Sequence, residues 1–462
     1  MAERELEIAR SLAEKAAGKG GRCFFVGGYV RDVIRNREKE NKDIDLEVHG
    51  LSYDQLRGLL EEEGECLTVG AGFGIFTLKD CRLDVAMPRS ERATGRGHRD
   101  FAVDVDPFLG TEKAAARRDF TMNALMQDVL TGEILDYFGG MEDIRRGIIR
   151  HVDRKSFTED PLRVLRGCQF SARFGYEIAE ETAALCREMD LSALPGERIL
   201  EELKKALLQA ERPSVFFEQL RRMDALEVWF PELKALIGVQ QDPLFHPEGD
   251  VWIHTMRTLD AAASLQKQAS RPLYFLLASL CHDMGKPAAT REIDGRIHAY
   301  GHDEQGMEPA ACFLRRITRE KKLEEYVCNM VRLHMRPNML VQQHASDKAF
   351  RRLFDLSEEP EDLLLLSKAD YLASLGGESY CETEKVLREK LEDFHRLMAM
   401  PWITAGDLME GGMRPGPALG EALAFSRKLR LAGVNRQEAL TQTLGTMRAA
   451  GQLPDGKGRP NG

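Results

Sequence analysis

The spacing of hydrophobic and polar positions changes along the chain, and a first pattern ends near residue 135. Short runs rich in β-forming residues alternate there with helical stretches, and they lie at 23–26, 44–48, 74–78 and 82–87. Glycines punctuate these runs. The alternation predicts a small α/β head, with a mixed β-sheet flanked by helices.

Helical periodicity dominates after residue 140, where strand patterns almost vanish. Four amphipathic stretches follow one another, at 161–174, 180–187, 197–208 and 215–223. A break that contains Pro243 and Pro247 precedes a second series of helices, and the chain ends in a tail that we expect to be disordered. The prediction is an α+β protein whose head is followed by an all-helical body. Its expected domains are residues 1–150, 151–237, 238–376 and 377–462.

The composition is that of an ordinary globular protein, with 43% hydrophobic and 30% charged residues among 462. No apolar run approaches the roughly 20 residues that a membrane span needs. Residues 1–21 are charged and lack the apolar core of a secretory signal. The nine cysteines include no C-x-x-C pair, which indicates reduced thiols. We therefore expect a cytoplasmic protein with no membrane partner.

The charge of the chain is distributed unevenly. A net charge of −10 argues against a generic basic coat for nucleic acid. Arginines nevertheless crowd residues 82–173. We expect any contact with RNA to be concentrated in that stretch.

The predicted strand at 23–26 runs directly into Gly27-Gly28-Tyr29-Val30-Arg31. Paired glycines let a phosphate approach the backbone where a strand turns into a helix, and the N-terminal amides of the helix favour an anion. Arg31 then stands within reach of a triphosphate. A glycine pair alone is usually only a turn.

Two carboxylates follow in the next predicted strand, in Asp43-Ile44-Asp45. Side chains repeat every second residue along a strand, so Asp43 and Asp45 project from one face and can share Mg²⁺. Asp84, on a neighbouring predicted strand, is the best candidate for a third carboxylate. One cation would activate the RNA 3′-hydroxyl, and the other would hold the triphosphate and the leaving pyrophosphate. The pattern favours a two-metal site, whereas a lone Asp-x-Asp is usually a solvated strand face.

In this order the two motifs resemble those of the bacterial tRNA nucleotidyltransferase and poly(A) polymerase family, which includes the CCA-adding enzymes. The resemblance implies that Asp43 and Asp45 bind the catalytic magnesium and that Gly28 and Arg31 contact the nucleotide.

The resemblance continues downstream of these residues. Residues 84–91 and 97–101 are similar to the family's mobile loop, and Arg117-Arg118-Asp119-Phe120 begins a stretch that matches its next motif. By this resemblance, Arg118 contacts the triphosphate and Asp119 helps to select ribose.

Asp160 and Arg163 begin the next predicted helix, at positions i and i+3 of one face. A carboxylate accepts from an exocyclic amine and a guanidinium donates to a ring nitrogen or carbonyl, which suits the edges of cytosine and adenine but not of uracil and guanine. In the family this protein edge replaces a template, and Arg166 adds a nucleotide contact. An ordinary salt bridge is the alternative for the pair alone. Gln169 stands where some relatives carry a further arginine, which puts a third basic contact in doubt.

A second group of ligand-type residues lies in the helical body. His254 falls on an amphipathic helix, His282-Asp283 near the end of an apolar helix that Gly285 is expected to end, and Asp370 on a third helix. Imidazoles and carboxylates from several helices can converge on one or two divalent cations and activate a bound water. These residue types leave the identity of the cation open.

This order of residues resembles the HD phosphohydrolase superfamily, in which a lysine such as Lys286 commonly follows. His302 and His334 are further candidate ligands. Bacterial CCA-adding enzymes with an attached HD domain share the arrangement, and in some of them the site acts as a 2′,3′-cyclic phosphodiesterase and phosphatase.

Three functions remain open at this point. The first is a CCA-adding enzyme that uses tRNA, ATP and CTP, favoured by the long arginine-bearing loop between Arg89 and Arg118. The second is an A-adding enzyme or poly(A) polymerase, because both activities can share the Asp160–Arg163 edge. The third is a nucleotide phosphohydrolase with an inactive head, against which the intact head motifs argue. The helices of the HD region also offer a surface for a homodimer.

Overall fold

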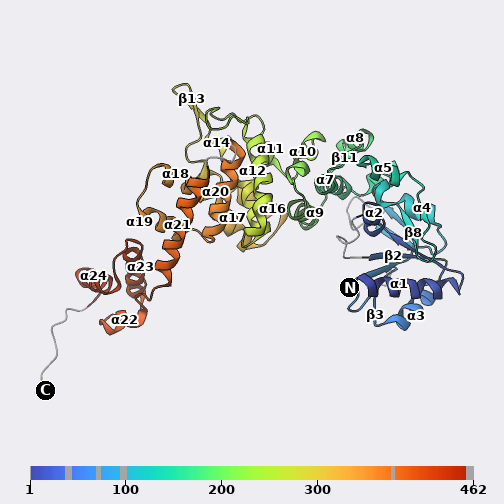
Figure 1. Cartoon of the computed structure of the whole chain (residues 1–462), viewed down its shortest axis with the longest axis horizontal. Helices are drawn as coiled ribbons and strands as arrows, with labels where there is room; N and C mark the ends of the chain where they lie inside the picture. Colours follow the sequence, from blue (N-terminus) through green and yellow to red (C-terminus); the bar gives the residue numbers. More distant parts are fainter. Residues whose placement is uncertain (1, 37–43, 69–73, 94–100, 376–379, 454–462) are drawn as a thin grey trace, which may run out of the picture. The chain divides into compact units, whose positions relative to one another are not determined.

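The computed structural model describes residues 2–36, 44–68, 74–93, 101–375 and 380–453 (Figure 1). The chain divides into two compact units. The first consists of Met1–Lys234 with Phe313–Arg319, and the second of Ala235–Cys312 with Glu320–Gly462. The expected division into four domains remains a prediction.

The described residues of the head form a seven-stranded sheet with the order β3-β4-β5-β2-β1-β8-β9. Its strands are β1 (Arg22–Val26), β2 (Ile44–His49), β3 (Cys66–Thr68), β4 (Ile75–Leu78), β5 (Leu83–Ala86), β8 (Met126–Asp128) and β9 (Ile134–Leu135). Strands β2 and β5 are parallel, and the other neighbours are antiparallel. The predicted mixed sheet is therefore confirmed.

The two faces of β2 have different partners because side chains alternate along a strand. Ile44, Leu46 and Val48 are buried on one face, whereas Asp45 is exposed on the other. Helices α1 (Ala2–Ala17) and α3 (Tyr53–Glu63) pack together on one side of the sheet, and α2 (Gly28–Ile34) lies on the opposite side (Figure 1). Strands β6 (Arg89–Ala93) and β7 (Phe101–Val105) form a separate antiparallel pair.

The rest of the first unit is mainly helical. Its elements are α4 (Thr111–Ala116), the 3₁₀ turn Thr121–Asn123, α5 (Gly140–Arg146), α6 (Arg154–Glu159), α7 (Leu162–Phe174), α8 (Glu180–Glu188), α9 (Gly196–Gln209), α10 (Ser214–Arg222) and α11 (Pro231–Lys234). Helix α7 packs against α9 and α10. Val164, Leu203 and Phe216 are buried completely between these helices, so the amphipathic pattern of the sequence corresponds to this packing.

The second unit is a helical assembly followed by a small C-terminal helical cluster. Its helices are α12 (Val251–Leu265), α13 (Pro272–Cys281), α14 (Lys286–Ala289), α15 (His302–Gln305), α16 (Met307–Ile317), α17 (Lys321–Leu333), α18 (Arg336–Gln342), α19 (Asp347–Leu356), α20 (Pro360–Leu375), α21 (Tyr380–Ala399), α22 (Ala405–Glu410), α23 (Pro417–Leu431) and α24 (Arg436–Ala449). Helix α16 extends beyond this unit, and the 3₁₀ turn Gln266–Gln268 follows α12.

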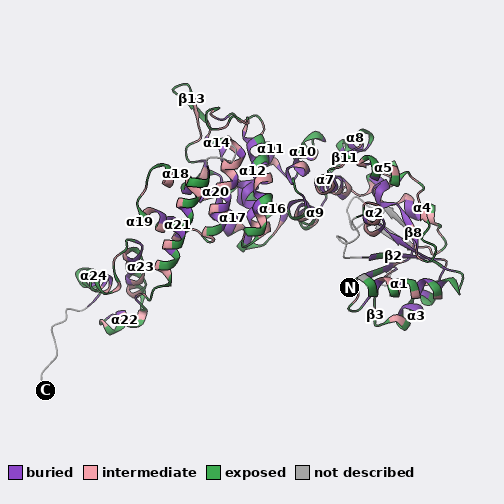
Figure 2. Cartoon of the chain, in the orientation of Figure 1, coloured by how far each residue is buried: buried purple, intermediate pink, exposed green. Residues whose placement is uncertain are grey.

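Helix α13 is the centre of the helical assembly. Its residues 275–281 are all buried, and it packs against α12, α17 and α20. Buried residues, in purple, gather around α12 and α17 of this assembly (Figure 2). A helix that is apolar all round belongs in a protein interior, so the sequence of α13 already indicates this position. In the C-terminal cluster, Leu408, Ala422 and Ala439 form a separate core.

Short strands interrupt the helical body that the sequence predicted. β10 (Ile148–Ile149) pairs with β11 (Glu177–Ile178), and β12 (Arg291–Ile293) pairs with β13 (Arg296–His298). Asp294 and Gly295 join the second pair with φ angles of 53° and 74°. An Asp-Gly turn of this kind is a strong hairpin signal, which outweighed the helical periodicity around it.

Gly285 has a different role from the one expected. It does not end α13, because α13 already ends at Cys281 and Gly285, with a φ of −84°, directly precedes α14. A Cβ atom at this position would lie 2.0 Å from the carbonyl oxygen of His302. Gly285 therefore allows close approach between two backbone segments that both carry candidate ligands.

In the described parts of the chain, no helix has both the length and the apolar character needed to cross a membrane.

Candidate active sites

A cleft of about 450 Å³ in the first unit gathers residues from the head and from helices α7 and α9. It collects most of the predicted nucleotide-site residues: Gly28, Arg31, Asp45, Arg118, Asp119, Asp160, Arg163 and Arg166. The wall also contains residues that the sequence motifs did not mark as ligands: Gly27, Asn123, Gln169, Phe170, Arg173, Arg198 and Lys205. The cleft is thus rich in cationic groups, as an anionic triphosphate requires.

The carboxylates of the head lie on adjacent parallel strands. Asp45 on β2 is in register with Asp84 on β5, so the two side chains leave the sheet on the same face. Thr77 donates a hydrogen bond to Asp84 at 2.9 Å. Asp43 lies outside the described residues. Like charges on neighbouring strands repel each other, and a shared cation removes that repulsion; oxygen donors of this kind suit Mg²⁺.

Gly27 brings the backbone close to these groups. Its φ is 65°, a region that residues with a Cβ atom rarely adopt. A Cβ atom there would lie 3.3 Å from Asp45 Oδ2 and 3.4 Å from Arg118 Nη1. The glycine turn therefore keeps a carboxylate and a guanidinium within one small space.

Arg31 is buried, and its guanidinium is held from several directions. Nε and Nη2 donate to Asp32 at 2.9 and 3.0 Å, and Nη1 donates to Asn123 Oδ1 at 2.8 Å. The group also lies over the rings of Phe170 and Phe174. Because these contacts fix its plane, Arg31 presents a preorganised positive charge to the cleft.

Arg118 is paired with a carboxylate that sequence reasoning missed. Its Nη2 donates to Glu47 Oε2 at 3.1 Å, and Glu47 Oε1 lies 2.8 Å from His49 Nε2. Burial alone would raise the pKa of Glu47, but His49 and Arg118 lower it overall. Glu47 stands two residues beyond Asp45 on the same face of β2, so strand alternation was a signal that could have found it.

Asp119 and Arg166 contact each other across the cleft wall. Arg166 approaches Asp119 Oδ2 with Nη2 at 2.6 Å and Nε at 2.7 Å, and Asn123 donates to Oδ1 at 3.0 Å. Burial would raise the pKa of Asp119, but Arg166 and the hydrogen bond from Asn123 hold it below its ordinary value. Asp119 is therefore an ionised acceptor.

Asp160 and Arg163 border the same cleft. The expectation that they share one helical face is wrong, because α7 begins at Leu162 and Asp160 before it has an extended backbone. Asp160 Oδ1 accepts from the backbone N–H of Leu162 at 3.0 Å. Arg163 donates to the carbonyl oxygen of Arg117 at 2.7 Å and to Ser156 Oγ at 3.3 Å. These contacts orient both side chains near the motif that contains Arg118.

Further basic residues approach the cleft at helical spacing. Arg173 follows Arg166 by seven residues on α7, and Lys205 follows Arg198 by seven on α9. Residues seven apart share a helix face, which is the signal that could have identified them. Burial and the nearby Arg31 lower the pKa of Arg173 to about 10. With its amide oriented to accept, Gln169 accepts a hydrogen bond from Arg173 Nη1 at 2.8 Å.

The second predicted site forms within the second unit. Histidines and carboxylates converge from α12, the end of α13, α15, the end of α17 and α20: His254, His282, Asp283, His302, His334 and Asp370. They form two groups of candidate metal ligands, His254 with His282 and Asp370, and Asp283 with His302 and His334.

Asp283 lies between the two groups. Its Oδ2 is 3.2 Å from His282 Nε2, and its Oδ1 is 3.4 Å from His302 Nε2. His254 Nε2 lies 3.0 Å from Asp370 Oδ1. Lys286 Nζ lies 2.7 Å from Asp283 Oδ2 and donates to Gln241 at 2.6 Å. The arrangement offers both oxygen and imidazole ligands to one or two divalent cations.

The imidazole nitrogens face one another in pairs. His254 and His282 approach with their Nε2 atoms 3.3 Å apart, and so do His302 and His334. The Nδ1 atoms of His282, His302 and His334 each lie 2.7 Å from a backbone carbonyl oxygen. Since a carbonyl only accepts, these Nδ1 atoms carry the proton and their Nε2 lone pairs point into the centre. Facing lone pairs repel unless a cation or proton lies between them, so the donor set fits a metal.

The acidic and basic groups of this centre are strongly perturbed. Burial, together with the charges of neighbouring His282 and His302, lowers the pKa of His334 to about 3. Burial would also lower the pKa of His254, but hydrogen bonds to Asp370 and Glu248 raise it to about 9. Burial opposes ionisation of Asp283, yet His282 and Lys286 hold its pKa well below the ordinary value.

Comparison with protein families divides the chain into three matched regions. Residues 23–150 match the Poly A polymerase head domain, residues 175–237 the probable RNA and SrmB-binding site of polymerase A, and residues 251–375 the HD domain.

Curated relatives match over most of the chain. The Multifunctional CCA protein of Xanthomonas euvesicatoria is 36% identical over 428 residues, which cover 90% of this chain and 99% of the relative. That of Stenotrophomonas maltophilia is 38% identical over 421 residues, covering 88% and 98%.

Solved structures share the fold at low sequence identity. The Thermotoga maritima CCA-adding enzyme, solved in complex with tRNA, has a TM-score of 0.63 and 20% identity, over 96% of this chain and 95% of its own. The Bacillus stearothermophilus CCA-adding enzyme in complex with CTP has the same TM-score and identity, over 97% and 98%.

Proposed function

Because the chain belongs to the family of multifunctional CCA proteins, we propose that it adds C, C and A to the 3′ end of tRNA from CTP and ATP. The observation that carries the proposal is the cleft that Asp45 lines together with Arg31, Arg118 and Arg163, one arginine from each of three motifs. The names of the relatives and the solved complexes with tRNA, ATP and CTP support this activity.

In the proposed reaction, Arg31 and Arg118 bind the triphosphate of the incoming nucleotide. Both guanidiniums are oriented before the nucleotide arrives, Arg31 by Asp32 and Asn123 and Arg118 by Glu47. Preorganised charge of this kind lowers the reorganisation needed as negative charge moves to the leaving pyrophosphate. Gly28 at the start of α2 lets phosphate oxygens approach the backbone.

Asp43, Asp45 and Asp84 are the proposed ligands of Mg²⁺. When bound there, magnesium supplies activation of the RNA 3′-hydroxyl and neutralises charge on the departing phosphates. The proposed two-metal arrangement draws support from the shared face of Asp45 and Asp84.

Asp160 and Arg163 are the proposed readers of the base. Their acceptor and donor groups match the amine and ring nitrogen that cytosine and adenine share, which uracil and guanine lack in that arrangement. Asp119 and Arg166 are proposed to meet the ribose and the nucleotide from the same cleft wall.

The test is an extension assay on tRNA that ends one, two or three nucleotides short, with each nucleoside triphosphate supplied separately. Stepwise incorporation of C, C and A is expected for the parent protein, and Asp45→Ala should abolish it. Incorporation of A alone would instead support an A-adding enzyme or a poly(A) polymerase. Activity that persists in Asp45→Ala would contradict the assignment of the catalytic carboxylates.

We propose a second activity for the HD centre, hydrolysis of 2′,3′-cyclic or 2′-phosphorylated nucleotides. The facing Nε2 atoms of four buried histidines around Asp283 support a metal-loaded centre. A divalent cation there supplies an activated water. Phosphate release from 2′,3′-cyclic AMP should require added metal and should be lost in Asp283→Ala, while that variant still extends tRNA. If Asp283→Ala releases phosphate as fast as the parent protein, the HD centre does not catalyse this hydrolysis.

The four expected domains, the homodimer and the cytoplasmic location remain part of the proposal. Light scattering of the full chain tests the homodimer directly, because a monomer and a dimer differ twofold in mass.

A further inference from the structure

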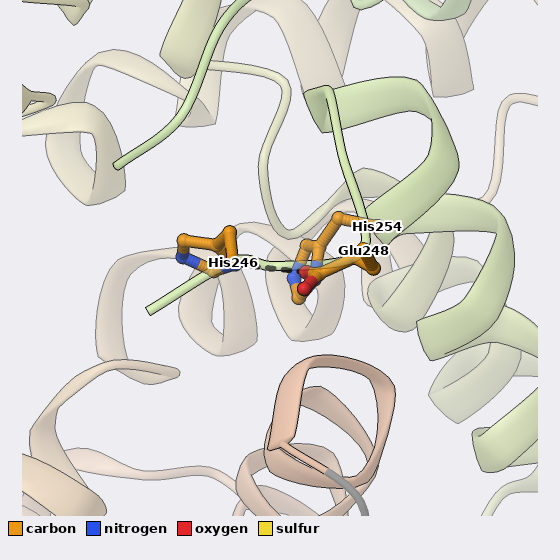
Figure 3. Close-up of side chains that lie close together, drawn as sticks. All are labelled: His246, Glu248 and His254. Atoms are coloured by element: carbon orange, nitrogen blue, oxygen red, sulfur yellow. Dashed lines mark hydrogen bonds and ion pairs between the residues drawn. The ribbon is translucent and has the colours of Figure 1, made fainter. Parts of the chain in front are cut away.

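Glu248 is a buried carboxylate that neither proposed reaction has used. Its side chain is 0% exposed, and a single oxygen, Oε1, lies 2.7 Å from His254 Nδ1 and 2.9 Å from His246 Nδ1 (Figure 3). Ser374 Oγ is farther from both nitrogens, at 3.4 Å. Among the described residues, the second oxygen of Glu248 has no hydrogen-bond partner. Keeping an ionised group in such a place is costly, so its contacts with the two histidines call for a function.

The Nδ1 atoms of the four histidines around the HD centre do not all donate to the same kind of acceptor. His282, His302 and His334 each donate from Nδ1 to the carbonyl oxygen three residues earlier, at 2.7 Å in every case. His254 instead donates from Nδ1 to the side chain of Glu248. Three of the imidazoles are therefore fixed by their own backbone, and the fourth depends on one carboxylate.

Local structure explains how Glu248 reaches His254. Asp250 caps α12 by accepting from the backbone N–H of Ile253 at 2.9 Å, and this places His254 in the first turn of the helix. Glu248 belongs to the segment that leads into this cap, six residues before His254. The chain before α12 thus folds back over the N-terminal end of the helix and buries the Glu248 carboxylate beside the His254 imidazole.

We propose that Glu248 is a positioning residue of the HD metal centre, which holds His254 with its proton on Nδ1 and directs Nε2 at the cation. This inference rests on the proposed metal centre. The opposite nitrogen of His254 lies 3.0 Å from Asp370 Oδ1 and 3.3 Å from His282 Nε2, where a shared cation would lie. A histidine that ligates a metal generally donates its other ring N–H to an acceptor, and that acceptor fixes both tautomer and ring orientation.

His246 supports this arrangement from the other side. It donates to the same oxygen of Glu248 and offsets part of the cost of burying the negative charge. Its side chain is 22% exposed, whereas those of His254 and Glu248 are 0% exposed. His246 is therefore the member of this group that solvent reaches.

A cation held directly by His246, Glu248 and His254 is the competing arrangement, because their ligand atoms lie within 4.8 Å of one another. The geometry favours the hydrogen-bonded form. A metal on Nδ1 of His254 would require one imidazole to bridge two cations, since its Nε2 already faces Asp370 and His282. The two arrangements differ in the number of cations bound, which is measurable.

The experiment titrates the metal-stripped full chain with Co²⁺, whose visible absorption reports imidazole ligation and separates this centre from the carboxylates of the head. Parent, Glu248→Ala and Glu248→Gln proteins are compared by calorimetry and absorption. The Ala variant should bind Co²⁺ about 10- to 100-fold more weakly with unchanged stoichiometry. The Gln variant keeps an acceptor oxygen and should stay within about threefold of the parent.

Asp362→Asn is the matched control. Asp362 is a fully buried carboxylate on α20 that accepts from Ser270 Oγ at 2.7 Å and Tyr326 Oη at 2.6 Å, two helical turns before Asp370. Its replacement should lower Tm but leave the Kd for Co²⁺ unchanged. Thermal unfolding of every variant separates a general loss of stability from a loss of metal affinity.

Three outcomes would overturn the inference, and they can be told apart. Parent-like Co²⁺ affinity in Glu248→Ala removes the role of Glu248 but leaves the metal centre intact. Loss of one bound equivalent, with the affinity of the others unchanged, assigns a metal to His246 and Glu248 directly. A parent protein without an imidazole-type Co²⁺ spectrum contradicts the metal centre itself, and the role of Glu248 with it.

Discussion

Arg166 approaches Asp119 side-on, with Nη2 and Nε 2.6 and 2.7 Å from the same carboxylate oxygen. The pair joins α7 to the motif that contains Arg118, and Asp119 is buried. One contact therefore links α7 to the proposed triphosphate site. Stability and the shape of the cleft should both depend on it.

Replacement of Asp119 by Asn should lower the free energy of unfolding by roughly 2–3 kcal/mol at pH 7, since it weakens charge-assisted hydrogen bonds of a buried group. The folded-state pKa of Asp119 is lowered, so its contribution is complete above the ordinary carboxyl pKa and declines as the pH falls toward the folded-state value. Urea denaturation from pH 7 to pH 3 should show the difference between parent and variant shrinking below about pH 4. A difference that stays constant with pH would contradict the ion pair.

Replacement of Gly27 by Ala should reduce transfer activity. Alanine at a φ of 65° and a ψ of −130° costs about 1–3 kcal/mol, and its Cβ would lie only 3.3 Å from Asp45 Oδ2. We expect kcat/KM for CTP to fall by roughly tenfold, equivalent to about 1.4 kcal/mol in the transition state. Gly132→Ala is the matched control, because Gly132 has a φ of 72° and a Cβ atom there would meet no described atom within 4 Å. Equal activity losses in the two variants would show that crowding of Asp45 by the added Cβ does not cause the loss.

Replacement of Glu47 by Gln should release Arg118 from its orienting partner. The carboxylate accepts from Arg118 at 3.1 Å and is also paired with His49. We expect KM for the nucleoside triphosphate to rise by about tenfold, with a smaller change in kcat, because binding of the triphosphate is affected most. Glu133→Gln, an exposed site on the same head, serves as the control. Unchanged KM in Glu47→Gln would show that Arg118 orients itself without this contact.

Replacement of Arg198 by Ala should weaken binding through the basic wall of the cleft. Arg198 lines the cleft together with Lys205 and Arg173. If Arg198 meets an RNA phosphate, the slope of log KM for tRNA against log salt should become shallower by about one. Arg57→Ala, which removes an exposed partner of Glu61 on α3, should leave the slope unchanged. A raised KM for nucleotide with an unaltered salt slope would assign Arg198 to the triphosphate instead.

The order of the motifs and the local direction of their side chains follow from the sequence alone. Residues two apart on a strand or three apart on a helix have relative directions set by the backbone itself. The strand and helix placements of Asp45, Arg31 and Arg163 therefore agree with the structure, whereas Asp160 lies before α7 with an extended backbone. The apolar pattern of α13 similarly determines that this helix is central.

Contacts between separate elements were decided only by tertiary packing. Nothing local links Glu47 to Arg118, 71 residues later, or Asp119 to Arg166, 47 residues later. Glu248 lies only six residues before His254 in the sequence, but only the folding of the chain over the N-terminal end of α12 brings its carboxylate to His254 Nδ1. Backbone geometry acts over a few residues, whereas these distances depend on how whole helices and strands pack, and that packing is a property of the entire core.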